Sequence, residues 1–183
     1  LYDYAGVNPQ NGNALWRNEE GLLTENYGEA RRINAGSPEP LWTGGFNTEL
    51  SWKGISLGIQ LEARYGNKVL NQDRSLFEAD GSYGDSNIWK GALNYWKKPG
   101  DTNVLPKPIY NNSSNSSQIS TRYLEDGSYL RIKDITLAYN LPSKWTKKAL
   151  MSGVRIYASA LNLYTFHNMN YWDPEHGTTG ATI

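Results

Sequence analysis

Residues 46–65 read FNTELSWKGISLGIQLEARY and contain two runs in which apolar and polar residues alternate strictly. Such alternation is typical of a β-strand with one apolar face. The two runs meet at Lys53-Gly54, a pair suited to a two-residue hairpin turn because glycine readily adopts a positive φ. This turn places Trp52 opposite Ile55 and keeps apolar residues opposite one another along the pair. The turn and the polarity therefore predict the same register. The further expected pairs are Leu50–Leu57, Thr48–Ile59 and Phe46–Leu61.

A second stretch, RYLEDGSYLRIKDITLAYNLP at 122–142, changes its apolar face partway along. Leu130 and Ile132 are apolar at even positions, whereas the apolar residues from Ile135 to Tyr139 occupy odd positions. We interpret this as a strand that keeps its register while the solvent outside it changes. Its odd face would meet lipid near one end and would carry charge at the headgroups near the other.

Segments rich in Gly, Pro, Asn and Ser separate the alternating runs. Short strands are expected inside the first of them, at 14–17 and 22–25. The low-complexity run NNSSNSS at 111–117 is expected to be a solvated linker. A further alternating run, VRIYASALNLYTF at 154–166, follows a short connection in which Ser143 would cap one basic helical turn.

The connections between the alternating runs differ in length according to the end at which they fall. Successive connections of an antiparallel meander alternate between two ends, which places short turns at one end and long loops at the other. Strands of about ten residues with this arrangement are typical of an outer-membrane β-barrel. We therefore predict an all-β antiparallel meander that is part of a large transmembrane β-barrel. The expected parts are a loop at 1–41, a hairpin at 43–66, a loop at 67–126, a hairpin at 127–166 and a loop at 167–183.

Composition excludes several other classes of protein. The 183 residues carry 18 basic and 18 acidic side chains, which argues against a nucleic-acid-binding surface. The absence of cysteine excludes a disulfide framework and thiolate metal sites. Because the chain begins without methionine or a signal-peptide pattern, we expect it to be an excised or processed segment.

Four stretches together resemble one family, the SusC/RagA-like TonB-dependent transporters of the Bacteroidetes outer membrane. AGVNPQNGNALW at 5–16 resembles the family's GVDP loop, and 38–71 is similar to its hairpin with a Gly-Gly-Phe sequence. LEDGSYLRIKDITLAYNLP at 124–142 and VRIYASALNLYTFHNMNYWDPE at 154–175 are similar to two further motifs of the family.

This resemblance implies a barrel of about 22 strands closed by an N-terminal plug. It also implies a SusD-like surface lipoprotein as partner, the TonB complex as energy source, and oligosaccharides or peptides as substrates. The long loops would be extracellular and the short turns periplasmic, in the outer membrane of a Gram-negative cell. This sequence contains no plug and no TonB box, so we expect it to be a late part of the barrel that cannot transport by itself.

Two groups of residues are candidates for function. Aromatic residues in the long segments suit contacts with substrate or partner, although packing between loops is the alternative. They are Trp89, Tyr95, Trp96, Tyr171 and Trp172. Polar residues on the strand faces opposite the apolar ones are expected to line the barrel lumen. They are Asn47, Glu49, Gln60, Glu62, Arg64 and Asp134.

Other functional readings of the sequence are less specific. His167, His176, Asp173 and Glu175 match no metal-binding template, and the loop at 78–87 lacks the order of ligands of a calcium loop, so no metal and no cofactor are predicted. A soluble β-sandwich that binds carbohydrate remains an alternative to the barrel. A third possibility is a fragment of a glycan-degrading hydrolase, with catalytic carboxylates chosen from Glu49, Glu62 and Asp134. The barrel interpretation predicts no enzyme.

Overall fold

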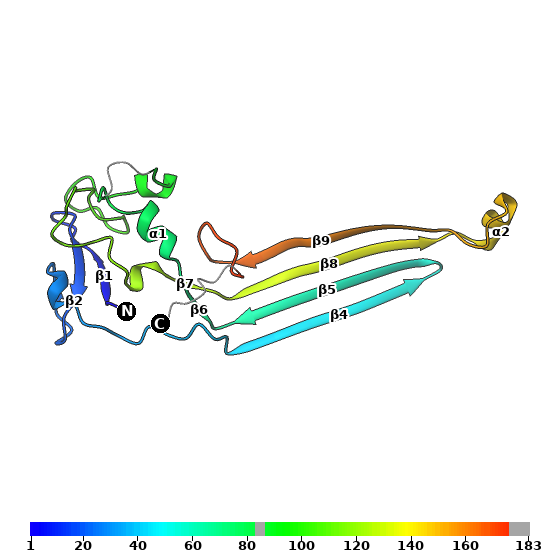
Figure 1. Ribbon diagram of the computed structural model, residues 1–183, viewed down its shortest axis with the longest axis horizontal. Coiled ribbons are helices and arrows are strands. Elements are labelled where there is room, and N and C mark those ends of the chain that lie inside the picture. The colour runs from blue at the N-terminus through cyan, green and yellow to red at the C-terminus, as the bar shows by residue number, and fades with distance from the viewer. Residues whose placement is uncertain (83–86, 176–183) are drawn as a thin grey trace. The chain divides into compact units, whose positions relative to one another are not determined.

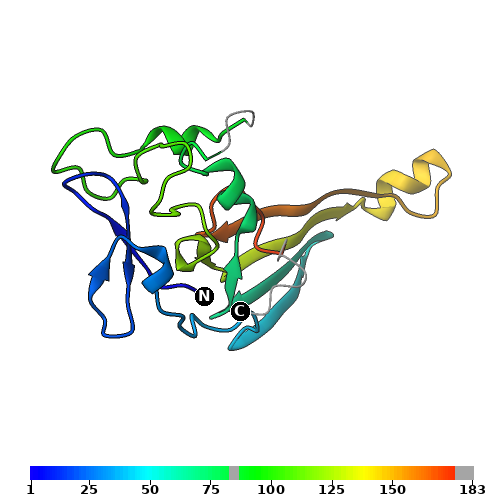
Figure 2. The same cartoon turned by 60° about the vertical axis from the view of Figure 1, so that its left-hand side comes forward.

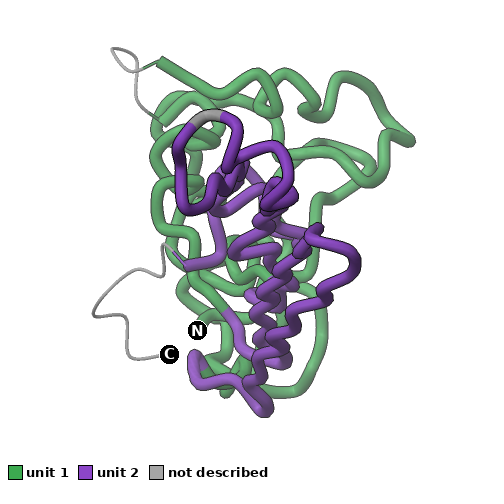
Figure 3. Tube along the Cα trace, turned by 90° about the vertical axis from the view of Figure 1, so that its right-hand side faces the viewer, with its two compact units in different colours: residues 1–37, 69–125, 177–183 green, residues 38–68, 126–176 purple. Residues whose placement is uncertain are grey.

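The computed structural model of the chain describes residues 1–82 and 87–175. The chain divides into two compact units, which Figure 3 colours separately. We call them the sheet unit and the loop unit. The sheet unit comprises residues 38–68 and 126–176, and the loop unit comprises residues 1–37, 69–125 and 177–183.

Four long antiparallel strands form the sheet unit. They lie side by side in the order β4-β5-β8-β9, as Figures 1 and 2 show. Their bounds are β4 (Trp42–Trp52), β5 (Ile55–Tyr65), β8 (Tyr129–Asn140) and β9 (Arg155–His167). Each strand joins its neighbour in an antiparallel ladder, so the connections at 53–54 and 141–154 lie at one end of the strands.

The hairpin of β4 and β5 has the predicted register. Trp52 pairs with Ile55, Leu50 with Leu57, and the pairing continues without interruption to the far end of both strands. Lys53 has φ 47° and Gly54 has φ 88°, which are the positive values that a tight hairpin turn requires. The prediction of this hairpin is confirmed.

The interpretation of β8 as a strand without a register change is wrong. Gln60 of β5 pairs with Asp134, but the next residue, Leu61, pairs with Ile132. Lys133 is therefore an extra residue in β8, and the pairing of β8 with β9 shifts at the same place. This is a β-bulge, which inserts a residue into one strand and shifts the alternation of side chains beyond it.

The bulge explains why the apolar positions of β8 change from odd to even when the strand is followed from Tyr139 back to Leu130. Beyond it, Leu130 lies opposite Ala63, and Ile132 lies opposite Leu61 on the apolar face of β5. Arg131 lies opposite Glu62 and faces the other way. The chain slips by one residue at the bulge, so its apolar side chains stay on the apolar face of the sheet and Arg131 stays on the other face.

The sheet has one apolar and one polar face. Leu57 pairs with Leu137 and Ile59 with Ile135, so these residues share a face as predicted. Large apolar side chains on this face are exposed, including Leu50 at 61% and Leu137 at 53%. Exposed apolar residues on a single sheet contradict the alternative of a β-sandwich, in which a second sheet would bury them.

The loop unit contains short elements. A small sheet has the strand order β1-β2-β3, and the strands expected at 14–17 and 22–25 are present as β2 and β3. Strands β6 and β7 form a separate two-stranded ladder. The elements are β1 (Tyr4–Val7), β2 (Ala14–Arg17), β3 (Leu23–Thr24), η1 (Tyr27–Glu29), β6 (Lys68–Leu70), α1 (Gln72–Phe77), η2 (Lys90–Leu93), η3 (Thr121–Tyr123) and β7 (Leu124–Asp126).

The core of the loop unit contains the run that was expected to be a solvated linker. Asn112, Ser114 and Ser116 are buried, and the Ser114 carbonyl accepts a hydrogen bond of 2.9 Å from Trp16 Nε1. The Asn112 side chain accepts bonds from the Ser114 N–H and hydroxyl, both at 2.9 Å. The expectation is wrong because small polar side chains can satisfy a buried backbone locally.

The connection between β8 and β9 contains α2 (Ser143–Thr146) and η4 (Lys147–Ala149). Pro142 occupies the N-cap position and makes no side-chain cap, so the expectation that Ser143 caps this turn is wrong. Proline is suited to a helix start because its φ is fixed near the helical value. Among the described residues, no helix is long and apolar enough to cross a membrane.

Candidate functional site

The polar face of the sheet brings together all six residues predicted to line a lumen. Asn47 pairs with Gln60, and Gln60 pairs with Asp134, so one row of polar side chains crosses three strands. Residues directly opposite one another in a ladder point to the same face. Glu49, Glu62 and Arg64 lie at alternate positions of the same strands and therefore on this face.

Hydrogen bonds extend the polar row into β9. Thr136 Oγ1 lies 2.9 Å from Asp134 Oδ1, and the Ser159 hydroxyl donates to Asp134 Oδ2 at 3.0 Å. The two hydroxyls lie 3.0 Å apart. These contacts give the face a hydrophilic surface in the middle of the strands, as the wall of an aqueous channel requires.

Arg131 is the centre of a charged cluster near the loop end of the sheet. Its side chain is only 7% exposed, and its Nε donates to Thr165 Oγ1 at 2.9 Å. The two terminal nitrogens bind the carboxylates of Asp173 and Glu175. The sequence WDPE is thereby tied to the polar face of β8.

Two further side chains complete this charged cluster. The Tyr129 hydroxyl lies 2.9 Å from Glu62 Oε1 and 3.2 Å from Glu175 Oε1, so its single proton is donated to one of these two carboxylates. Lys133, the extra residue of the bulge, lies 3.0 Å from Glu62 and 3.7 Å from Glu175. Because of the bulge, Arg131 and Lys133 both lie on the polar face, and both form ion pairs with acidic side chains there.

Asp173 lies in the segment after β9, and its surroundings in this cluster shift its pKa. Burial alone would raise the pKa of Asp173, but a hydrogen bond from the Glu175 N–H and the contact with Arg131 outweigh burial. The pKa of Asp173 consequently lies below its ordinary value of 3.8. The carboxylate is charged at neutral pH and holds residues 168–175 on the sheet.

Sequence reasoning did not identify Arg131 and Tyr129 as parts of a site. It considered Asp173 and Glu175 only as possible metal ligands. Arg131 could have been assigned to the polar face only if the position of the bulge had been known. The spacing of residues alone does not locate that bulge.

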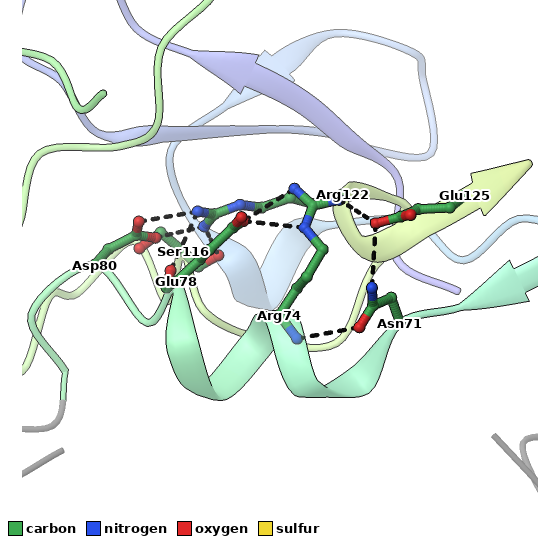
Figure 4. Close-up of polar contacts among 7 residues, drawn as sticks. All are labelled: Asn71, Arg74, Glu78, Asp80, Ser116, Arg122 and Glu125. Atoms are coloured by element: carbon green, nitrogen blue, oxygen red, sulfur yellow. Dashed lines mark hydrogen bonds and ion pairs between the residues drawn. The ribbon is translucent and has the colours of Figure 1, made fainter. Parts of the chain in front are cut away.

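The loop unit contains a second ionic cluster, which Figure 4 shows. Arg122 binds both carboxylate oxygens of Asp80, and its Nη1 donates to the Ser116 carbonyl at 2.7 Å. The two charged side chains are 3% and 2% exposed. Burial alone would lower the pKa of Arg122, but its bonds to Asp80 outweigh burial and raise that pKa.

Arg74 of α1 connects the helix to β7 in the same cluster. It donates to Glu78 at 2.9 and 3.1 Å and to Glu125 at 2.8 Å. Asn71 caps the helix by accepting a bond of 3.3 Å from the Arg74 N–H. Together the two arginines join residues 71–80 to residues 116–125 of the loop unit (Figure 4).

The five aromatic candidates fall into two environments. Trp96 is buried and donates from Nε1 to the Pro9 carbonyl at 3.1 Å. Its ring packs closely against Gly12, where a Cβ atom would lie only 2.7 Å from the ring. Trp89 is half-buried and stacks on Phe77 with ring centroids 4.7 Å apart. These contacts support packing. Tyr95 is half-buried, and Tyr171 and Trp172 are 51% and 40% exposed.

No group of three or more potential metal-ligating side chains is found within residues 1–82 and 87–175. His176 and part of the loop at 78–87 lie outside the described residues. Asp80 of that loop binds Arg122.

The chain is similar to several known proteins. No protein-family model matches it. It is 34% identical over 146 residues to TonB-dependent receptor P3 of Formosa agariphila, and 28% identical over 149 residues to TonB-dependent receptor P26 of the same organism. These alignments cover 80% and 79% of this chain but only 14% of either receptor.

Solved structures give the same result. The structure of the RagAB peptide transporter matches 97% of this chain at 32% identity and a TM-score of 0.80, and this chain covers 20% of it. The RagAB peptide importer in its closed-closed state matches at 33% identity with a TM-score of 0.79. All these names describe receptors and transporters rather than enzymes.

An antiparallel sheet of long strands with an exposed apolar face and a hydrophilic face defines a piece of the wall of an outer-membrane β-barrel. The alignments with known proteins specify which barrel. The chain belongs to the SusC/RagA-like TonB-dependent receptors and spans about a seventh of the length of the curated relatives it matches.

Proposed function

We propose that the full-length protein containing this chain imports peptides across the outer membrane. The observation that carries the proposal is the two-faced sheet, with an apolar face for lipid and a continuous polar face for an aqueous lumen. Peptides are the first substrate class to test because the matched solved structures are named as a peptide transporter and a peptide importer.

The polar face lines the transport path in this proposal. The six polar residues predicted for the lumen lie on that face, and the Arg131 cluster stands at its loop end. Residues 168–175 are fixed to the barrel wall through Asp173 and Glu175 and present Tyr171 and Trp172 to the entrance. Exposed aromatic rings with a polar atom suit contact with a peptide or with a partner protein.

The partners follow from the resemblance to the family. We propose that the long segments at 1–41, 67–126 and 167–183 are extracellular and that a SusD-like lipoprotein covers them. The short turns would be periplasmic. The TonB complex would act through a region of the full-length protein outside this chain.

The test uses a strain that lacks the full-length receptor and is complemented with variants. Tyr171→Ala/Trp172→Ala is compared with Tyr110→Ala, which removes an aromatic ring that is 71% exposed in another loop. We expect the double variant to take up fluorescent peptides at a clearly lower rate, while Tyr110→Ala keeps the normal rate. Heat-modifiable gel mobility checks that each barrel assembles.

Each outcome has a defined meaning. Normal peptide uptake in the strain without the receptor contradicts peptide import. Loss of growth on oligosaccharides, with unchanged peptide uptake, would assign the alternative substrate. Equal uptake by wild type and the double variant would reduce Tyr171 and Trp172 to packing, without affecting the import proposal itself.

A further inference from the structure

The short-turn end of the sheet unit carries positive charge only. Glu49 and Glu62 are the nearest acids on either side of the β4–β5 turn, and residues 135–172 contain no acid. Figures 1 and 2 show this turn and α2 at the same end of the strands. The exposed cations there are Lys53, Lys144, Lys147, Lys148 and Arg155. Within the described residues, none of the five forms an ion pair, in contrast to Arg131 and Lys133 at the other end.

Large apolar side chains accompany these cations. Trp145 is 59% exposed, Leu150 is 97% exposed and Met151 is 47% exposed. Lysine beside tryptophan and leucine is the composition of segments that lie at the surface of an anionic membrane. Exposed together in one short connection, these apolar side chains are suited to contact with the apolar part of a membrane.

Two residues at this end adopt a conformation that glycine or asparagine adopts more easily. Lys53 has φ 47° at the first position of the hairpin turn, where asparagine is preferred. Leu150 has φ 57° after η4, at a position where glycine usually ends a helix. Side chains retained at a conformational cost point to a role outside the fold of the turn.

A groove on the same part of the sheet provides a place for an acyl chain. It has a volume of about 540 Å³, and Lys53 is one of the residues that line it. Ile55, Tyr139 and Ile156 line it, together with further residues of β8 and β9. An apolar groove with a lysine in its lining matches the two parts of a phospholipid.

We propose that the short-turn end binds anionic phospholipid, with the phosphate headgroup at the lysines and an acyl chain in the groove. The 141–154 connection then lies at the membrane surface, where Trp145 and Leu150 enter the headgroup region. The inference rests on the barrel placement described above but not on the transported substrate. Charge complementarity selects an anionic lipid, because the two connections at this end offer four lysines and no acid, whereas Arg155 lies opposite Asn140 on the polar face.

The test uses the full-length receptor in phosphatidylcholine vesicles. A minor fraction of the lipid is either brominated phosphatidylglycerol or brominated phosphatidylcholine, and bromine quenches tryptophan fluorescence on contact. The Trp145 signal is the difference between the receptor and its Trp145→Phe variant. We expect brominated phosphatidylglycerol to quench this signal at about a fivefold lower mole fraction than brominated phosphatidylcholine.

Matched variants locate the preference. Lys144→Gln/Lys147→Gln/Lys148→Gln should bring the two lipids close to equal, whereas Lys90→Gln/Lys97→Gln/Lys98→Gln in the loop unit should leave the preference unchanged. Lys53→Asn and Leu150→Gly relieve the backbone conformation, so they should fold normally and still weaken the preference. These two variants separate lipid binding from folding.

Two further outcomes overturn the inference, and a third separates it from the proposed function. Equal quenching of wild type by both lipids excludes an anionic site. If Lys144→Gln/Lys147→Gln/Lys148→Gln keeps the lipid preference but loses peptide uptake, these lysines bind a protein partner instead. A lipid preference in a receptor that imports no peptide would refute the proposed function while supporting the lipid site.

Discussion

Arg122 of the loop unit and Arg131 of the sheet unit both bind acidic side chains, but their surroundings differ. Arg122 and Asp80 are both almost fully buried. Arg131 is buried as well, but Asp173 and Glu175 are 42% and 31% exposed. A buried pair cannot lose one partner without leaving an unpaired charge in the interior, whereas exposed acids can exchange the arginine for water.

This difference indicates two roles for similar chemistry. The Arg122 cluster maintains the fold of a unit that has few large apolar side chains in its core. The Arg131 cluster attaches one short segment to a strand whose own ladder does not depend on it.

Arg122→Met should have the largest effect because it leaves Asp80 charged and buried. We expect the loop unit to lose about 3–5 kcal/mol of local stability. Hydrogen exchange in the full-length receptor should show faster exchange in residues 1–37 and 69–125. Arg17→Met, at an exposed position of β2, is the control and should leave exchange unchanged. Equal protection in both variants would contradict the structural role of the buried pair.

Ile59→Arg tests the apolar face of the sheet unit. It should cost about 2–4 kcal/mol in a lipid refolding assay if Ile59 lies near the middle of the bilayer. Gln60→Arg, at the next position and on the polar face, should cost far less. The assignment of the two faces fails if Gln60→Arg is the more damaging substitution.

Asp173→Asn should have a small effect, about 0.2–1 kcal/mol, because the carboxylate is partly exposed. Since the folded-state pKa of Asp173 lies below 3.8, its contribution is complete above the unfolded-state value. The contribution is lost only as the pH falls through the lower, folded-state pKa. A spin label at Asn170 should therefore keep one mobility from pH 7 to about pH 4 and become more mobile below that.

The variant provides the control for this titration. In Asp173→Asn the label should be slightly more mobile at neutral pH and should lose most of the acid transition. An acid transition of full size in the variant would mean that another carboxylate fixes the segment.

The hairpin of β4 and β5 could be predicted from sequence because two independent signals agree. Its turn and its polarity specify one register, and the ladder has no bulge. The bulge of β8 could not be predicted from sequence, because the same pattern has two explanations. A change of apolar side fits either a register shift or a change of solvent, and only the pairing partners of Gln60 and Leu61 decide between them.

The interior of the loop unit was less accessible to sequence reasoning. Trp16 and Ser114 are 98 residues apart, and the sequence around neither residue predicts their hydrogen bond. A run of Asn and Ser looks like a solvated linker because its side chains are polar. Its burial depends on distant partners that local composition does not contain.

We infer that β8 belongs to a barrel wall and that the bulge at Lys133 keeps its apolar side chains toward lipid. Because this chain contains no cysteine, single cysteines at 130–137 in an otherwise cysteine-free full-length receptor can carry spin labels. Collisions with oxygen report lipid, and collisions with a polar nickel complex report water. We predict high oxygen contact at 130, 132, 135 and 137, with low contact at 131, 134 and 136. Uninterrupted alternation from 130 to 137 would contradict the account.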